Sequence, residues 1–219
     1  MPGRSDIWAI IPIKDLYNGK TRLSPVLSPP ERALLIEAMV DDVLSAFAEY
    51  AGMRVLIVTG DPRVAAKAEG LGMETLMEEV CQSETAAVEA ATAHAIEQGA
   101  GGTLVVPADI PLLRAKDVAG IVEGAPARGT LLVPGWDGRG TNAVIRRPAG
   151  LFPLRFGNDS FLPHRAAAEA TGYPLVILEN DQIGLDLDSP VELRRFLTVD
   201  RVTRTRRVVD TFDLKQRLP

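Results

Sequence analysis

Three aspartates stand at points of the sequence where an apolar segment ends. Asp109 follows VVPA and precedes IPLL, so that prolines flank it on both sides, and Asp186 and Asp188 alternate with leucines in LDLDSP. Alternate residues of an extended segment point to the same side, and carboxylate oxygens are ligands that Mg²⁺ prefers. The pattern therefore predicts a metal site. The alternative is that Asp109 caps a turn or helix, and that Asp188 or Ser189 caps a helix beginning after it.

A cationic segment follows the first apolar run. Lys14, Lys20 and Arg22 lie within nine residues of one another, with a glycine between the lysines. Such a segment can wrap a polyphosphate, whose charge requires lysine or arginine for neutralisation. It is not a P-loop, because the glycine-flanked GK[ST] pattern is missing. The alternative is that Lys14 and Lys20 are ordinary surface lysines.

Two glycine-containing turns are candidates for contacts with a ligand. The segment GWDGRGTN, residues 135–142, allows backbone amides to approach a ligand closely. In FGNDSF, Gly157 precedes Ser160 where a helix is expected to begin, and a helix N-terminus with a hydroxyl binds anions readily. Ser160 as a plain helix cap is the alternative. His164 is expected to pack or cap in preference to catalysing, and Cys81 is expected to be incidental.

The apolar pattern places these candidates on a sheet with helices. Strands alternate with helices in units of about 30 residues, which is typical of an α/β domain with a largely parallel sheet and helices on both faces. Ligands of such sheets bind at the carboxyl ends of the strands. We predict one domain over residues 5–198. The expected strands are 7–13, 54–59, 74–77, 103–106, 130–133, 142–145 and 175–178, and the expected helices begin near 29, 62, 83, 114, 161 and 190.

The last residues, 199–219, form a basic C-terminal extension. They contain five arginines and one lysine against three aspartates. We expect a solvated tail or an added hairpin; a dimer contact or a substrate lid is the alternative.

Composition excludes several classes of protein. The formal net charge is −5, which argues against a protein that coats nucleic acid. One cysteine excludes a disulfide framework and a zinc site built on several thiolates. No apolar run approaches 18 residues, and the first residues, MPGRSD, lack a hydrophobic signal region. We therefore expect a soluble cytoplasmic protein with neither a nucleic acid nor a membrane as partner.

Taken in order, the motifs resemble those of the 2-phospho-L-lactate and phosphoenolpyruvate guanylyltransferases of coenzyme F420 biosynthesis. The matching segments are IPIKDLYNGKTRLSPVLSPPER, LVVPADIPLL, GRGTNAVI, FGNDSFLPH and LDLDSP. The resemblance implies a single nucleotidyltransferase-type, Rossmann-like domain. It also implies Mg²⁺-dependent transfer of GMP from GTP to a small phosphorylated carboxylic acid, with release of pyrophosphate. The acid is phosphoenolpyruvate, 2-phospho-L-lactate or 3-phospho-D-glycerate. A homodimer, and hand-off of the product to the next transferase of the pathway, are further implications.

Family roles carry over where residues match. The resemblance assigns binding of the triphosphate to Lys14, Lys20 and Arg22, and catalytic roles to Lys20, Arg22 and Asp109. It assigns metal binding to Asp109, Asp186 and Asp188, and binding of the phosphorylated acid to Thr141, Gly157 and Ser160.

One segment departs from the family pattern. Where many relatives have a Gly-Leu-Asn run, residues 81–88 read CQSETAAV. We expect this segment to lie near the base, with Ser83 and Thr85 binding the nucleotide, and the departure leaves the base preference open. Three other functions remain as alternatives: a nucleotidyltransferase for a sugar phosphate, cofactor or lipid precursor, a glycosyltransferase that uses an Asp-x-Asp pair, and a non-catalytic nucleotide-binding regulator.

Overall fold

The computed structural model describes residues 6–14, 16, 19–78, 83–157, 159–214 and 216–218. Cys81 and Gln82, part of the segment that departs from the family pattern, lie outside the described residues, as does Lys215 of the basic extension.

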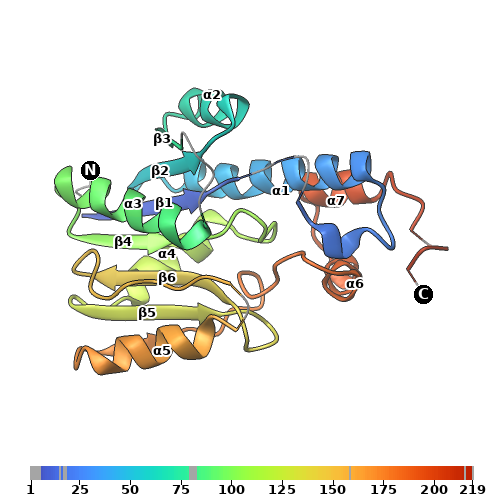
Figure 1. The fold of residues 1–219 in the computed structure, drawn as a ribbon. Coiled ribbons are helices and arrows are strands. Elements are labelled where there is room, and N and C mark those ends of the chain that lie inside the picture. Colours follow the sequence, from blue (N-terminus) through green and yellow to red (C-terminus); the bar gives the residue numbers. More distant parts are fainter. Residues whose placement is uncertain are drawn as a thin grey trace.

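A seven-stranded sheet runs through the molecule (Figure 1). Its order is β3 (Glu74–Met77), β2 (Arg54–Thr59), β1 (Ile7–Pro12), β4 (Gly102–Val105), β6 (Thr141–Arg147), β5 (Gly129–Pro134) and β7 (Leu175–Ile177). Neighbouring strands are parallel except where β6 pairs with β4 and β5. Because β6 is reversed, its first residues lie at the same edge of the sheet as the carboxyl ends of the parallel strands. The predicted largely parallel sheet is confirmed.

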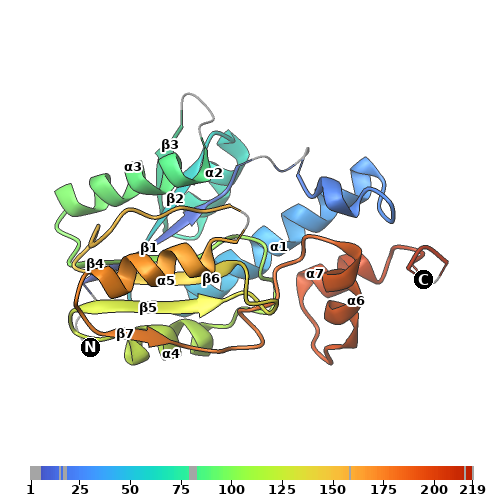
Figure 2. The same ribbon diagram turned by 60° about the horizontal axis from the view of Figure 1, so that its bottom comes forward.

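Helices cover both faces of the sheet. They are α1 (Pro29–Glu49), α2 (Pro62–Gly70), α3 (Glu84–Glu97), α4 (Ala115–Gly124), α5 (Phe161–Ala170), α6 (Pro190–Thr198) and α7 (Arg204–Val209), with a 3₁₀ turn η1 (Thr21–Leu23). Figure 2 shows α3 and α5 together on one face. Side chains of β1 alternate accordingly: Ile7, Ala9 and Ile11 join the core beneath α1 and α4, whereas Trp8 and Ile10 join the core beneath α3.

Helix starts follow the local sequence signals. The Glu31 carboxylate accepts hydrogen bonds from the backbone N–H and the hydroxyl of Ser28, each at 2.7 Å, which closes the first turn of α1. Asp61 caps α2 by accepting from the N–H of Arg63 at 2.9 Å, and Ser83 caps α3. The three helices therefore begin within one or two residues of where the sequence predicts them.

The C-terminal extension differs from the expected tail or hairpin. Residues 204–209 form α7, and both ribbon views place α6 and α7 beyond the carboxyl end of the sheet, with α7 beside α1 (Figures 1 and 2). The Asp42 carboxylate on α1 accepts from the backbone N–H groups of Arg204 and Thr205 at 2.9 and 2.8 Å, while Val209 is buried. The expectation of a solvated tail or a hairpin was wrong because these partners lie about 160 residues earlier in the chain.

Within the described residues, none of the helices combines the length and the apolar character needed to span a bilayer.

Candidate functional site

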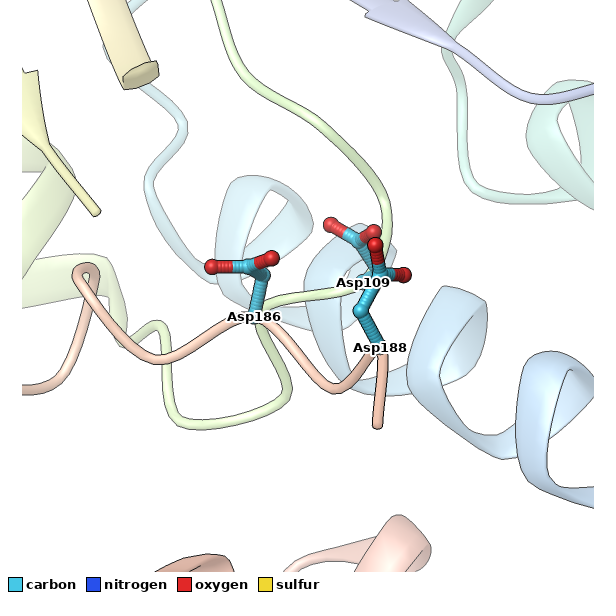
Figure 3. Close-up of side chains that lie close together, drawn as sticks. All are labelled: Asp109, Asp186 and Asp188. Atoms are coloured by element: carbon cyan, nitrogen blue, oxygen red, sulfur yellow. The ribbon is translucent and has the colours of Figure 1, made fainter. Parts of the chain in front are cut away.

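The three aspartates converge at the carboxyl edge of the sheet. One oxygen from each of Asp109, Asp186 and Asp188 lies within 4.8 Å of the others. Figure 3 shows Asp109 on the loop that follows β4, and the other two on the loop that leads to α6. Asp109 stands 77 positions before Asp186 in the sequence, so the fold, and not local spacing, brings it to the other two. This trio is called the carboxylate cluster below.

Backbone contacts and buried leucines fix the carboxylate cluster. The N–H of Leu187 donates to the carbonyl of Asp109 at 3.0 Å, which joins the two loops. Leu185 and Leu187 are buried in the core, so the aspartates that alternate with them face the opposite side. One of the alternative capping roles is confirmed: the hydroxyl of Ser189 accepts from the N–H of Val191 in the first turn of α6 at 3.2 Å. The Asp188 carboxylate instead contacts Lys20 and Arg22.

Lys20 joins two members of the cluster. Its Nζ lies 2.6 Å from Oδ2 of Asp109 and also contacts Oδ1 of Asp188. The lysine side chain is 11% exposed, so it is not an ordinary surface lysine. Burial alone would favour the neutral amine, but the two carboxylates outweigh it and raise the pKa of Lys20 above its ordinary value, so the ammonium is retained.

The cluster concentrates negative charge beyond what Lys20 neutralises. Burial, and then the nearby charge of Asp109, raise the pKa of Asp186 to about 6. The same two causes, in the same order, raise the pKa of Glu84 to about 7. Among the described residues Oδ1 of Asp109 is buried and has no hydrogen-bond partner. An unpartnered carboxylate oxygen inside a group of hard oxygen donors fits a small divalent cation such as Mg²⁺.

The remaining cationic candidates lie around the cluster. Nη1 of Arg22 is 3.7 Å from Oδ2 of Asp188, and its side chain is largely exposed. Lys14 is half-buried and lines a cavity of about 350 Å³ on the Lys20 side of the cluster, together with Glu84. The structure therefore brings all three basic residues to the same edge of the sheet as the carboxylates.

The two polar candidates for the nucleotide make structural hydrogen bonds. The hydroxyl of Ser83 accepts from the N–H of Ala86 at 3.2 Å as the cap of α3. Thr85 Oγ1 accepts from the N–H of Phe156 at 3.0 Å and so joins α3 to the loop before Gly157. Both stand at the N-terminal end of α3, and neither side chain is free of a partner.

Thr141, Gly157 and Ser160 form a second group beside the cluster. The Ser160 hydroxyl lies 3.2 Å from Oγ1 of Thr141 and makes no capping bond to α5, unlike the plain cap that was the alternative. Gly157 has a φ of 132°, a conformation that L side chains rarely adopt, so a larger residue there would be strained. We call these three residues the hydroxyl subsite.

The cluster and the hydroxyl subsite line one cleft of about 500 Å³. Its described lining is strongly acidic, with seven carboxylate side chains against two arginines. The acidic residues are Glu84, Asp109, Asp137, Asp159, Asp186, Asp188 and Glu192, and the arginines are Arg22 and Arg139. An anionic ligand can enter such a cleft only with cations that neutralise the carboxylates.

Two residues of the site were not among the sequence candidates. Asn142 donates from Nδ2 to Oδ1 of Asp186 at 3.1 Å and to the carbonyl of Ile183 at 2.9 Å, and so orients a member of the cluster. Glu84 begins α3, where an acidic residue is common for helix stability alone, so its type gave no signal. Asn142 stands in the GTNA motif, which was the signal that could have identified it.

Sequence comparisons identify relatives over most of the chain. The family model described as "Guanylyl transferase CofC like" matches residues 7–215. A phosphoenolpyruvate guanylyltransferase of Rubrobacter xylanophilus is 38% identical over 190 residues, 86% of this chain and 92% of the relative. A 2-phospho-L-lactate guanylyltransferase of Methanothermobacter thermautotrophicus is 33% identical over 198 residues, 90% of this chain and 87% of the relative. The resemblance drawn from the motifs, and the expectation of an enzyme of the nucleotidyltransferase class, are confirmed.

Solved structures support the same fold. A nucleotidyl transferase from Methanothermobacter superposes with a TM-score of 0.61 at 18% identity, covering 94% of this chain and 98% of the other. A protein of Desulfovibrio desulfuricans, provisionally described as a nucleotide-diphospho-sugar transferase, superposes with a TM-score of 0.77 at 18% identity, covering 94% of each chain. The α/β fold of nucleotidyltransferases, expected from the sequence, is confirmed.

Proposed function

Because the chain belongs to the family of CofC-like guanylyl transferases, we propose that it transfers GMP from GTP to a small phosphorylated carboxylic acid and releases pyrophosphate. Phosphoenolpyruvate and 2-phospho-L-lactate are the acids in the names of the two relatives described above, and 3-phospho-D-glycerate is the third candidate. The product is a guanosine-diphospho-acid, which we expect to feed coenzyme F420 synthesis in the cytoplasm. A homodimer and hand-off of the product to the next transferase stay predictions from the resemblance.

One observation carries the proposal: the carboxylate cluster, bridged by Lys20, lies in the same cleft as the hydroxyl subsite. A triphosphate and a phosphorylated acid are both multiply anionic, whereas the described lining of the cleft is acidic. Their simultaneous binding therefore requires divalent cations. The residues present fit Mg²⁺, which Asp109, Asp186 and Asp188 would hold. When bound, the ion polarises phosphate oxygens and neutralises charge that develops on them.

The residues of this chain supply binding and charge neutralisation in the proposed reaction. An oxygen of the acid's phosphate forms a bond to the α-phosphorus of GTP, while the bond from that phosphorus to the pyrophosphate breaks. Lys20 and Arg22 stabilise the charge that collects on the leaving pyrophosphate. Thr141 and Ser160 hold the acid's phosphate. No general base is needed, because the second pKa of a phosphomonoester is near 6, so the attacking oxygen is already ionised at neutral pH.

Release of pyrophosphate by the purified protein tests the proposal. The protein is given Mg²⁺, GTP and one of the three acids at a time, with ATP, CTP and UTP as controls for the base. We expect release with GTP and one acid, and none with EDTA in place of Mg²⁺. Release with another nucleotide would keep the transferase but reassign the base, consistent with the departure at residues 81–88. No release with any pair of substrates would refute the proposed reaction.

A further inference from the structure

His164 connects the hydroxyl subsite to the backbone behind it. It lies in the first turn of α5 and is 1% exposed. Its Nε2 accepts a hydrogen bond from the backbone N–H of Arg155 at 2.8 Å, and its Nδ1 lies 3.0 Å from Oγ1 of Thr141. The ring of Phe156 packs edge-on against the imidazole, with centroids 5.2 Å apart, which holds the ring in this orientation.

These contacts determine where the imidazole proton lies. A backbone N–H is always a donor, so Nε2 of His164 must be the unprotonated nitrogen. In a neutral ring the proton then lies on Nδ1, which donates to Thr141. The ring is neutral because burial, and then the charge of Arg146, lower the pKa of His164 to about 4.

The tautomer decides what the hydroxyl subsite offers to a ligand. Thr141 Oγ1 accepts from His164, and one of the two hydroxyl protons of Thr141 and Ser160 serves their mutual contact at 3.2 Å. One hydroxyl proton is therefore left over. If Nδ1 were instead the acceptor, Thr141 would donate to it and Ser160 to Thr141, and both protons would be consumed. Phosphate and carboxylate oxygens accept hydrogen bonds, so only the first arrangement offers them a donor.

We propose that His164 is a positioning residue that keeps Thr141 and Ser160 in the donor state required to bind the phosphorylated acid. His164 acts through Thr141 and does not touch the acid. The inference rests on the proposed function, because it assigns the acid to this subsite. It also explains why a histidine stands at a buried position that a purely apolar residue could fill.

The first test needs no substrate. The chain has two histidines, so protein labelled with ¹⁵N-histidine gives two imidazole spin systems, and H164N identifies that of His164. We expect His164 to be a neutral imidazole with its proton on Nδ1 at pH 7. A proton on Nε2, or an imidazolium, would overturn the proposal whatever reaction the enzyme catalyses.

The second test separates the two ring nitrogens by substitution. In H164N the side-chain amide reaches the position of Nδ1 and can donate to Thr141. In H164Q the amide reaches the position of Nε2, keeping an acceptor for Arg155 but no donor for Thr141. We expect H164Q to raise the KM for the acid roughly 10-fold, with the KM for GTP and kcat nearly unchanged, and H164N to restore most of the loss. Equal KM values for the two variants would contradict the proposal.

A double-mutant cycle excludes a merely structural effect. T141V removes the hydroxyl through which His164 acts, so H164Q should cause no further rise in the acid KM in that background. Additive effects would contradict the proposal. If T141V alone leaves the acid KM unchanged, the acid does not bind at this subsite, and the assignment of the subsite fails together with the role of His164. If T141V still releases pyrophosphate, the proposed reaction itself stands, even though the acid does not bind at this subsite.

Discussion

The carboxylate cluster and the contact of the C-terminal extension with α1 are both rich in charge, but they arrange it differently. We call the second region the dock; it consists of α7 and Arg217 of the extension together with Glu31 and Asp42 of α1. In the cluster, like charges are gathered and partly desolvated, and the pKa of Asp186 is raised to about 6. In the dock, opposite charges are paired: the guanidinium of Arg217 donates two hydrogen bonds to Glu31, at 2.8 and 3.0 Å, and chiefly through this pairing the pKa of Glu31 is lowered to about 2.

The difference in the direction of these pKa shifts separates a binding site from a structural contact. A raised carboxyl pKa means that the folded protein holds the charged form at a disadvantage, which a bound cation removes. A lowered pKa means that the fold itself already stabilises the charged form. We therefore expect changes at the cluster to affect turnover and metal dependence, and changes at the dock to affect stability alone.

The largest expected effect follows from removing a member of the cluster. Asp109→Ala should lower turnover by more than about 100-fold, because a lost metal carboxylate removes several kcal/mol of charge stabilisation. The protein should stay folded, since Lys20 keeps Asp188 as a partner. Steady-state release of pyrophosphate measures the effect. The control is Asp210→Ala, which breaks an exposed ion pair with Arg206 in α7. Equal turnover of the two variants would remove Asp109 from the site.

Lys20→Met should destabilise the metal-free protein. Asp109 and Asp188 lose their shared cation, and because both are partly exposed we expect a loss of roughly 1–3 kcal/mol, less than for a fully buried pair. Added Mg²⁺ should then raise the melting temperature more than it does in the wild type. Thermal melts in EDTA and in Mg²⁺ measure this difference. The control is Lys67→Met, which breaks the ion pairs of Lys67 on α2 with Glu37 and Asp41 on α1. An identical Mg²⁺ response in all three proteins contradicts the prediction.

At the dock, Val209→Ala tests whether burial of α7 stabilises the fold. Val209 is 1% exposed, and deleting its two methyl groups should lower the free energy of unfolding by about 1–2 kcal/mol without changing kcat. Urea denaturation measures the first quantity. Val202→Ala is the matched control, since Val202 is 72% exposed and its truncation should change stability by less than about 0.5 kcal/mol. Equal free energies of unfolding for Val209→Ala and Val202→Ala would mean that α7 does not contribute to the structure that unfolds cooperatively.

The smallest effect is a pH dependence of the same dock. A carboxyl whose pKa is lowered on folding contributes stability above its ordinary pKa, near 4.5, and loses it as the pH falls toward about 2. Glu31→Gln should therefore be less stable than the wild type by about 1 kcal/mol at pH 7, with the difference shrinking as the pH falls from about 4.5 toward about 2. Urea melts at several pH values measure it. A difference that does not change with pH would argue against the charged pairing with Arg217.

The sequence predicted the elements well because their signals are local. Strands β2 and β3 have the predicted bounds, and the Ser28 and Asp61 caps stand where the sequence indicates helix starts. Helix α7 was missed because its six residues carry three arginines and no apolar stripe of useful length, and the carboxylate of Asp42 that caps it lies on another helix.

The site was predictable in its residue types but not in its contacts. The alternation of Asp186 and Asp188 with buried leucines is a local pattern, so their shared side could be inferred. The contacts of Lys20 with Asp109 and Asp188 join it to residues 89 and 168 positions away. Lys20 also adopts a left-handed φ of 55°, which the residue type does not predict. The orientation of Asp186 likewise depends on Asn142 of a distant strand. Such long-range pairings need the tertiary fold.

The measurement that most directly tests the central claim is a crystal structure with Mn²⁺ and a non-hydrolysable GTP analogue, in which anomalous scattering locates the metal. We expect Mn²⁺ in contact with oxygens of Asp109, Asp186 and Asp188, with the Lys20 ammonium turned toward the phosphates. A nucleotide bound without Mn²⁺ at the cluster, with Lys20 still joining Asp109 to Asp188, would contradict it.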